Sequence, residues 1–192
     1  MQQLVWYTCY GSNLSRERFL CYLKGRKIPG RTQAERGAKD PSDPVKDKPV
    51  ILPYQLYFAL HVDGWDGSGV AFIDLKQDTY AKTYGRSYLI TEEQFFDVVR
   101  QENLMPPDAP IVLDYDALKK NGSVVLFEGD YYGRLLYLGE SEGYPCYTFT
   151  AIKSMQEQEL TTPFGAYYQI IAEGLKESHG LSGETVAEYL TQ

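Results

Sequence analysis

The first apolar run of the chain leads directly into a turn and then a helix. Val5 to Tyr10 is rich in β-branched and aromatic residues, which is typical of a largely buried strand. Gly11-Ser12-Asn13 then supplies a residue without a Cβ and two side chains that favour turns and helix starts. Apolar residues recur at helical spacing between Leu14 and Lys24, and Gly25 closes the segment. The pattern predicts a strand, a tight turn and a helix.

A polar stretch and further strands follow this helix. Arg26 to Pro49 is dense in Pro, Gly, Lys and Asp without a sustained apolar period, which predicts a long surface loop. Within it, residues 37–41 either shape the rim of a pocket or form a solvated connection. Strand composition returns in Ile51–Leu60, in the second half of Asp63–Leu75, and in Thr83–Ile90.

The glycines near Trp65 do not form a dinucleotide-binding loop. Gly67 and Gly69 lack the third glycine of that motif because Phe72 stands there, and a strand follows where a helix is required. Asp63 and Asp66 also lack the spacing of calcium ligands. Glycines at the start of a strand beside a large aromatic residue predict instead that two backbones approach closely.

A second helix begins at Thr91, which forms a capping box with Gln94. Phe95, Val98 and Val99 mark its buried stripe. The residues expected on its solvent face are Asp97, Arg100 and Gln101.

Glu102 lies where this apolar stripe would continue, three residues after Val99. Burying a carboxylate without partners is costly, so a carboxylate on a buried face usually has a function. Periodicity alone leaves a second interpretation open, in which Glu102 lies past the end of the stripe and reaches water, because Pro106 and Pro107 stop the helix.

The last third of the chain predicts three strands and two helices. Between the second helix and these strands, Val112–Lys119 is weakly helical or irregular. The strands are Val124–Phe127, Tyr131–Leu138 and Tyr144–Thr150, with hairpin connections at residues 128–130 and 139–143. The helices are one with Thr162 as its N-cap that ends at His179-Gly180, and one capped by Ser182 that runs to Leu190.

Length and charge narrow the class of protein. With 192 residues, the chain is expected to form one domain over residues 1–192. A net charge of -7 argues against non-specific binding to nucleic acid or anionic membranes, which needs a basic face. No apolar run is long enough to span a bilayer, and no signal-peptide pattern stands at the N-terminus.

Cysteine and histidine usage limits the chemistry. Cys9, Cys21 and Cys146 are widely spaced, which suits free thiols in the reducing cytoplasm better than disulfides. His61 and His179 are the two histidines of the chain, so a histidine-rich metal site is excluded. The 17 tyrosines are consistent either with a β-rich fold or with an aromatic-lined pocket.

The turn after the first strand has two interpretations from its residues alone. A turn that leads into a helix N-terminus offers free N–H groups and the positive end of a helix dipole, which suits an anion. The same arrangement is also common as an ordinary connection between elements.

The order of several motifs along the chain helps to distinguish these two interpretations of the turn. Residues 10–14 read Tyr-Gly-Ser-Asn-Leu, and Arg18-Phe19 follows in the helix. Residues 65–71 are similar to a Trp-x-Gly-Gly-x-Ala motif with Ser68 intervening, and Gln101-Glu102 ends the second helix. With Tyr167 ahead of Ile170-Ile171 near the C-terminus, the chain resembles the gamma-glutamylcyclotransferase-like superfamily over nearly its whole length.

The resemblance implies an α+β fold, a small mixed β-barrel with helices packed outside. It also implies an enzyme of acyltransferase or lyase type that cleaves γ-glutamyl amides and releases 5-oxoproline without a metal or cofactor. Glu102 would match the catalytic acid/base. The loop that holds the γ-glutamyl group would be Tyr10, Gly11, Ser12, Asn13 and Leu14, and Tyr167 would line the substrate cleft.

The chemistry of this reaction agrees with the residues present. The substrate's own α-amine attacks its γ-amide carbonyl, so proximity within a five-membered ring supplies much of the acceleration. One carboxylate can take the proton from the amine and deliver it to the leaving nitrogen. The expected partner is therefore a small γ-glutamyl substrate in the cytoplasm, with no nucleic acid or membrane.

Two other functions remain as alternatives. One is a non-catalytic module of the same fold that binds a small carboxylate-containing ligand or a protein partner. The other is a hydrolase with Ser12 or Cys9 as nucleophile, which is weakly supported because the chain has no G-x-S-x-G motif.

Overall fold

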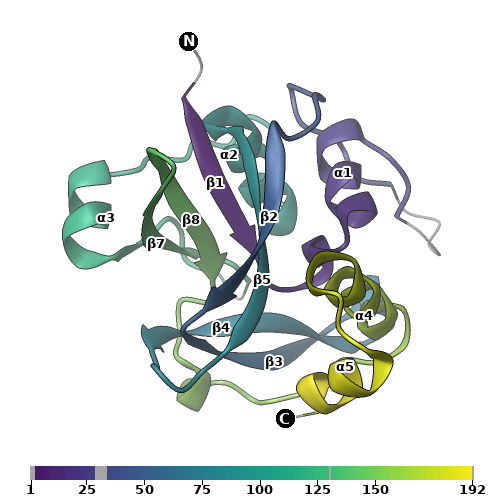
Figure 1. The fold of residues 1–192 in the computed structure, drawn as a ribbon. Helices are drawn as coiled ribbons and strands as arrows, with labels where there is room; N and C mark the ends of the chain where they lie inside the picture. Colours follow the sequence, from purple (N-terminus) through teal and green to yellow (C-terminus); the bar gives the residue numbers. More distant parts are fainter. Residues whose placement is uncertain (1–2, 29–33, 130, 192) are drawn as a thin grey trace. The chain divides into compact units, whose positions relative to one another are not determined.

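The computed structural model has a mixed α+β fold and describes residues 3–28, 34–129 and 131–191. Its strands form a six-stranded sheet in the order β2-β5-β1-β8-β7-β6 and a separate two-stranded sheet, β3-β4 (Figure 1). The strands are β1 (Leu4–Cys9), β2 (Lys46–Leu52), β3 (Tyr54–Val62), β4 (Ser68–Gln77), β5 (Thr83–Thr91), β6 (Ser123–Val125), β7 (Arg134–Ser141) and β8 (Tyr144–Thr150). The α-helices are α1 (Arg16–Lys24), α2 (Glu92–Glu102), α3 (Tyr115–Asn121), α4 (Gly165–His179) and α5 (Gly183–Leu190), and the 3-10 helices are η1 (Ser12–Leu14), η2 (Asp63–Trp65) and η3 (Met155–Glu157).

The chain divides into two compact units, each built from three segments. Unit 1 consists of Met1–Thr8, Leu20–Asp47 and Ser87–Ile152. Unit 2 consists of Cys9–Phe19, Lys48–Arg86 and Lys153–Gln192. The expectation that residues 1–192 form one domain stays a prediction.

The closed barrel implied by the resemblance is not confirmed. No strand pairing within the described residues joins the two sheets, and β2 and β6 are the edges of the larger one. β6 has three residues, and Pro49 in β2 has no N–H to donate to a neighbour. Short strands and proline are usual means of ending a sheet, so both edges are poorly suited to further pairing.

The core of unit 1 is aromatic. The ring of Tyr7 stacks on Phe149 at 5.2 Å between centroids and lies 5.7 Å from Phe95 of α2. Phe95 also lies 5.8 Å from the ring of Tyr147. These contacts pack α2 against one face of β1 and β8, as Figure 1 shows. The capping box of Thr91 with Gln94 and the buried stripe of α2 are confirmed.

The prediction that Asp97, Arg100 and Gln101 form the solvent face of α2 is wrong. Asp97 and Gln101 are both buried, and Arg100 is half-buried. Asp97 accepts hydrogen bonds from the backbone N–H of Lys39 at 2.8 Å and from Arg100 at 3.0 Å. Gln101 accepts from the N–H of Gly37 at 3.1 Å and donates to the Tyr22 carbonyl at 3.0 Å.

The segment after α1 is therefore more than a solvated loop. Gln94 completes its attachment by donating to the carbonyls of Asp40 and Ser42. Residues 37–42 thus lie along α2, held by side chains spaced three and four residues apart on one face of the helix. The predicted loop also ends earlier than expected, because β2 begins at Lys46.

Two further elements of unit 1 differ from the prediction for local reasons. Asp114 caps α3 by accepting from the N–H of Ala117 at 2.9 Å, so the weakly helical segment forms a helix. Glu142 and Gly143 both have positive φ, which gives the tight two-residue turn of a β-hairpin and lets β7 run to Ser141. The other predicted connection, at residues 128–130, includes Asp130, which lies outside the described residues.

Unit 2 contains the β3-β4 hairpin and the C-terminal helices. Tyr57 of β3 stacks on its cross-strand neighbour Phe72 of β4 at 5.6 Å between centroids. Helix α4 begins at Gly165, after Phe164, so the prediction that Thr162 is its N-cap is wrong. Its predicted C-terminal end is confirmed, with Gly180 in the left-handed conformation. Ser182 caps α5 as predicted.

Across the residues that the structure describes, no helix is long and apolar enough to cross a membrane.

Candidate functional site

The predicted turn lies in unit 2 and is a short 3-10 helix. The N–H of Leu14 donates to the Gly11 carbonyl at 3.0 Å, and the N–H of Ser15 donates to the Ser12 carbonyl at 3.2 Å. Tyr10, Asn13 and Leu14 are buried, whereas Gly11 and Ser12 are half-buried. The accessible part of the turn is therefore its beginning.

The N-terminus of α1 is already occupied by groups of the protein itself. The N–H of Arg16 donates to the Glu177 carboxylate at 3.2 Å, and the N–H of Arg18 lies 3.4 Å from the Ser15 hydroxyl. These contacts occupy two of the N–H groups that the first turn of α1 could offer to an anion. A ligand that binds this turn would consequently contact Gly11 and Ser12, and not the N-terminus of α1.

Tyr167 of α4 lies directly against the turn. Its side chain is 2% exposed, and its hydroxyl accepts a hydrogen bond from the N–H of Ala71 at 2.9 Å. A Cβ placed on Gly11 would lie 3.1 Å from this hydroxyl and 3.3 Å from the Ala71 Cβ. A side chain at position 11 would therefore require Tyr167 and Ala71 to give way by a few tenths of an ångström, and the turn, β4 and α4 meet at one point.

Trp65 adds an accessible aromatic surface beside Tyr167. The half-buried Trp65 ring meets Tyr167 edge to face at 5.0 Å between centroids. The buried Arg18 guanidinium lies 5.8 Å from the centre of the Trp65 ring, within the range of a cation–π contact. Two of the motifs that carried the resemblance, Tyr-Gly-Ser-Asn-Leu and the tryptophan motif, thus lie together in unit 2.

The inserted serine of the tryptophan motif has a structural role. Ser68 is fully buried, and its hydroxyl accepts from the N–H of Phe164 at 3.0 Å and donates to the Gly69 carbonyl at 3.1 Å. A Cβ on Gly69 would lie 2.0 Å from the Thr161 hydroxyl, and the N–H of Gly69 donates to Thr162 at 3.2 Å. The predicted close approach of two backbones at these glycines is confirmed.

Two residues that fix the turn were given no role from the sequence. Arg86 donates to the Leu14 carbonyl at 3.0 Å and to the Glu177 carboxylate at 2.8 Å. Glu177 in turn accepts from Arg16, so the pair joins the end of the turn, the start of α1 and α4. No sequence signal marks Arg86, because its partners are 72 and 91 residues away.

We expect Arg86→Met to lower the free energy of unfolding by about 2 kcal/mol. The substitution keeps the apolar stem but leaves the Leu14 carbonyl and the Glu177 carboxylate without this donor, and a hydrogen bond to a charged group contributes about 1.5–3 kcal/mol. Urea unfolding measures the change. Lys76→Met, at an exposed position of the same unit, is the control. Equal stability of the two variants would contradict this role for Arg86.

The stability of unit 2 depends on pH through His179. Its Nε2 lies 2.8 Å from the Gly85 carbonyl, so the neutral ring donates there. Burial lowers the pKa of His179 below its usual value, with a smaller contribution from the Arg86 charge, whereas the Gly85 carbonyl acts in the opposite direction. The unfolded chain therefore binds a proton more readily than the folded one, and stability falls as the pH drops below about 6.5.

His179→Gln is expected to remove this part of the pH dependence. Between about pH 5 and 7, the stability of the variant should fall less steeply on acidification than that of the wild type. Thermal unfolding at half-unit pH steps measures the slope. His61→Gln, at an exposed position, serves as the control and should keep the wild-type slope. An unchanged slope in His179→Gln would contradict the prediction.

The last predicted site residue lies in the other unit. Glu102 is the final residue of α2 in unit 1 and is half-buried. Its half-buried position agrees with neither extreme that periodicity left open, full burial or full exposure. The structure thus brings together the turn and Tyr167 within unit 2, and the role of Glu102 is part of the proposal below. Across the described residues, no three His, Cys, Asp or Glu side chains gather as they would around a metal ion.

Comparison with solved structures identifies the fold. A gamma-glutamyl cyclotransferase matches 97% of this chain and 86% of its own with a TM-score of 0.55, at 19% sequence identity. The chain has the gamma-glutamyl cyclotransferase fold. An uncharacterized human protein gives the same coverage, TM-score and identity. The resemblance seen in the sequence motifs is confirmed at the level of the fold.

Sequence comparison adds a longer relative. Histone deacetylase 5 of Arabidopsis thaliana is 32% identical to this chain over 198 residues, a match that includes 97% of the chain but 30% of the relative. The chain thus spans less than a third of the length of that relative. No protein-family model matches the chain.

Proposed function

We propose that the protein is a cyclotransferase that cleaves a small γ-glutamyl amide and releases 5-oxoproline. The observation that carries the proposal is the junction at Gly11, where the turn, the Tyr167 hydroxyl and β4 meet in a chain with the cyclotransferase fold. The half-buried Gly11 and Ser12 offer the γ-glutamyl group backbone and hydroxyl contacts. Trp65 and Tyr167 line the same part of unit 2.

In the proposed reaction, the α-amine of the substrate attacks its own γ-carbonyl. A carbon–nitrogen bond closes the five-membered ring, the original amide bond breaks, and the proton lost by the amine is needed by the leaving nitrogen. Glu102 accepts this proton and delivers it, so no water is consumed and no external nucleophile is needed. Tyr10, Asn13 and Leu14 support the turn from the buried side.

Incubation with a panel of γ-glutamyl amides tests the proposal. The panel contains γ-glutamyl amino acids, a γ-glutamyl amine and a γ-glutamyl conjugate of an acylated small molecule, and 5-oxoproline is quantified. Release from at least one substrate is expected. Failure with every member of the panel would overturn the proposal.

A second candidate is a non-catalytic module of the same fold. It is favoured by the match to one part of a longer relative that carries a different name. Such a module would bind a small carboxylate-containing ligand or a protein partner. Binding of a γ-glutamyl amide without release of 5-oxoproline is the result that this candidate predicts.

We propose that the protein acts in the cytoplasm. Support comes from Cys9, Cys21 and Cys146, which are all free thiols, as is usual in reducing compartments. Localisation of a tagged full-length protein to an oxidising compartment would contradict this.

A further inference from the structure

The end of α2, directly after Glu102, has a strained backbone. Leu104 has a φ of 54° and is exposed. The N–H of Met105 donates to the Arg100 carbonyl at 2.8 Å, and the N–H of Leu104 to the Gln101 carbonyl at 3.2 Å. These bonds form a Schellman motif, in which glycine usually takes the left-handed position because a Cβ there is unfavourable. Such strain persists only where the surrounding structure holds it, often at functional sites.

The side chain of Asn103 holds this end of the helix. Asn103 is the C-cap of α2 and is half-buried. Its Nδ2 donates to the Val99 carbonyl at 2.8 Å, and its Oδ1 accepts from the N–H of Tyr132 at 2.9 Å. A longer bond joins Nδ2 to the Tyr132 carbonyl at 3.4 Å. The amide group thus pairs with the backbone of Tyr132 on both sides while it stays bonded to the last turn of the helix.

Tyr132 connects Asn103 to the core of unit 1. The Tyr132 ring meets Phe149 edge to face at 5.3 Å between centroids, and Phe149 belongs to the aromatic core of this unit. The backbone beside Tyr132 is fixed as well, because the Gly133 carbonyl accepts from the N–H of Leu126 at 2.8 Å. Asn103 therefore attaches the end of α2 to a well-packed part of the unit.

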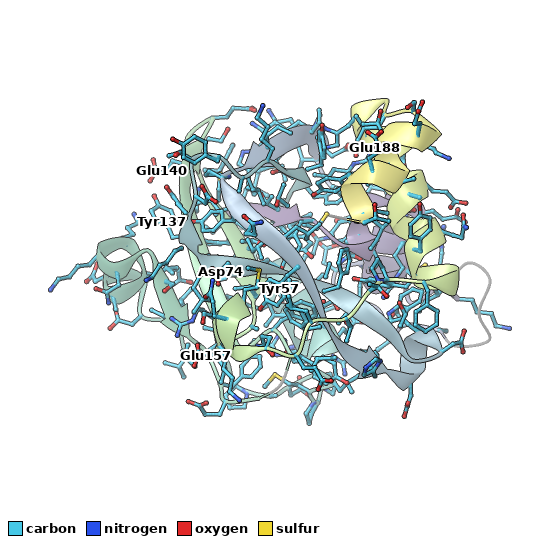
Figure 2. The ribbon with its side chains drawn as sticks, turned by 90° about the horizontal axis from the view of Figure 1, so that it is seen from below. Tyr57, Asp74, Tyr137, Glu140, Glu157 and Glu188 are labelled. Carbon is cyan, nitrogen blue, oxygen red and sulfur yellow. The ribbon has the colours of Figure 1, made fainter. Side chains whose placement is uncertain are left out.

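Glu102 lies between two residues that are fixed in this way. Gln101, which precedes it, donates to the Tyr22 carbonyl at 3.0 Å, and Asn103 follows it. Glu102 itself is half-buried. The glutamates labelled in Figure 2 differ from it, because they are exposed and extend outward: Glu140, Glu157 and Glu188. The carboxylate of Glu102 is thus carried by a backbone that is held on both sides.

We propose that Asn103 is a positioning residue, which fixes the end of α2 and thereby holds the Glu102 carboxylate in place for proton transfer. The inference rests on the proposed function, in which Glu102 carries a proton from the α-amine to the leaving nitrogen. Proton transfer requires a distance of about 2.6–3.2 Å between the two heavy atoms. Misplacement by about 1 Å can lower the rate by about 100-fold, so a loose helix end would be costly for catalysis.

Asn103→Ala tests the catalytic consequence. For the best γ-glutamyl substrate, kcat should fall by about 10- to 100-fold, whereas KM should stay within about twofold because the turn and Tyr167 are unchanged. The matched control is Asp114→Ala, which removes the N-cap of α3 and so weakens unit 1 away from α2. The control should keep the wild-type kcat when both variants are assayed well below their melting temperatures. Equal kcat values in the two variants would overturn the proposal.

Amide hydrogen exchange tests the fixation of the helix end without any turnover. In Asn103→Ala, the backbone N–H groups of residues 103–105 should exchange at least about tenfold faster than in Asp114→Ala, because the bonds that hold the helix end are lost. If the wild type releases no 5-oxoproline, the proposed function fails, and faster exchange in Asn103→Ala still supports the fixation of α2 by Asn103. Unchanged exchange at these residues, or faster exchange with an unchanged kcat, would overturn the proposal.

Discussion

Glu102→Gln is expected to reduce the release of 5-oxoproline by at least about 100-fold, since positioned general acid–base catalysis typically contributes 10²–10⁴-fold. Glutamine has almost the same shape but cannot take the proton from the α-amine or deliver it to the leaving nitrogen. Because the turn and Tyr167 are unchanged, the affinity for a γ-glutamyl ligand should be retained. The measurement is kcat for the best substrate of the panel, together with the Kd of a non-cleavable analogue.

Stability separates a catalytic effect from a structural one. Glutamine keeps the shape of Glu102 at the last residue of α2, so the melting temperature should stay close to that of the wild type. Glu93→Gln, the same change at an exposed position of that helix, should keep full activity. Turnover close to that of the wild type in Glu102→Gln would contradict the assignment of Glu102 as the general acid/base.

Gly174→Ala is expected to destabilise unit 2 by about 3 kcal/mol, at the upper end of what overpacking a core usually costs. A Cβ at this position would lie 2.4 Å from the Ser15 nitrogen and 2.6 Å from the Leu14 Cβ. The nitrogen belongs to the backbone, which cannot rotate away as a flexible side chain could. The methyl group would therefore push α4 and the turn apart. Thermal unfolding should show a melting temperature lower by about 6–12 °C.

Gly183→Ala is the matched control for this prediction. Nothing lies within 4 Å of a Cβ at Gly183, which is exposed at the first position of α5. Alanine should therefore be neutral or stabilise the helix by about 0.5 kcal/mol. If both alanine variants melt together with the wild type, the close packing of α4 on the turn is not required for stability.

The elements with strong local signals could be predicted from the sequence. The capping box at Thr91, the Ser182 cap and the stop at Gly180 all formed where expected, because each depends on residues three or four positions apart. Phe164 replaced Thr162 as the cap of α4, because Ser68 bonds the N–H of Phe164 and Gly69 bonds the Thr162 carbonyl. Those partners lie more than 90 residues earlier, beyond the reach of any local pattern.

The buried polar face of α2 was missed for a similar reason. Periodicity treats Asp97 and Gln101 as solvent-facing because they are polar. Their partners, the backbone N–H groups of Lys39 and Gly37, belong to a segment with no periodic pattern of its own. A polar side chain can be buried at little energetic cost when its hydrogen bonds are satisfied. The helix sequence contains no pattern that predicts such burial.

By itself, the sequence determined the strand, turn and helix around Gly11, the positions of most other elements, and the motifs that matched a known fold. Short-range spacing, capping and glycine placement decide these features. Only the tertiary structure decided that the Tyr167 hydroxyl lies against Gly11, that Arg86 and Glu177 fix the turn, and that the α1 N-terminus is already occupied. Each of these depends on side chains far apart along the chain, whose meeting is set by packing and by the need to satisfy buried polar groups.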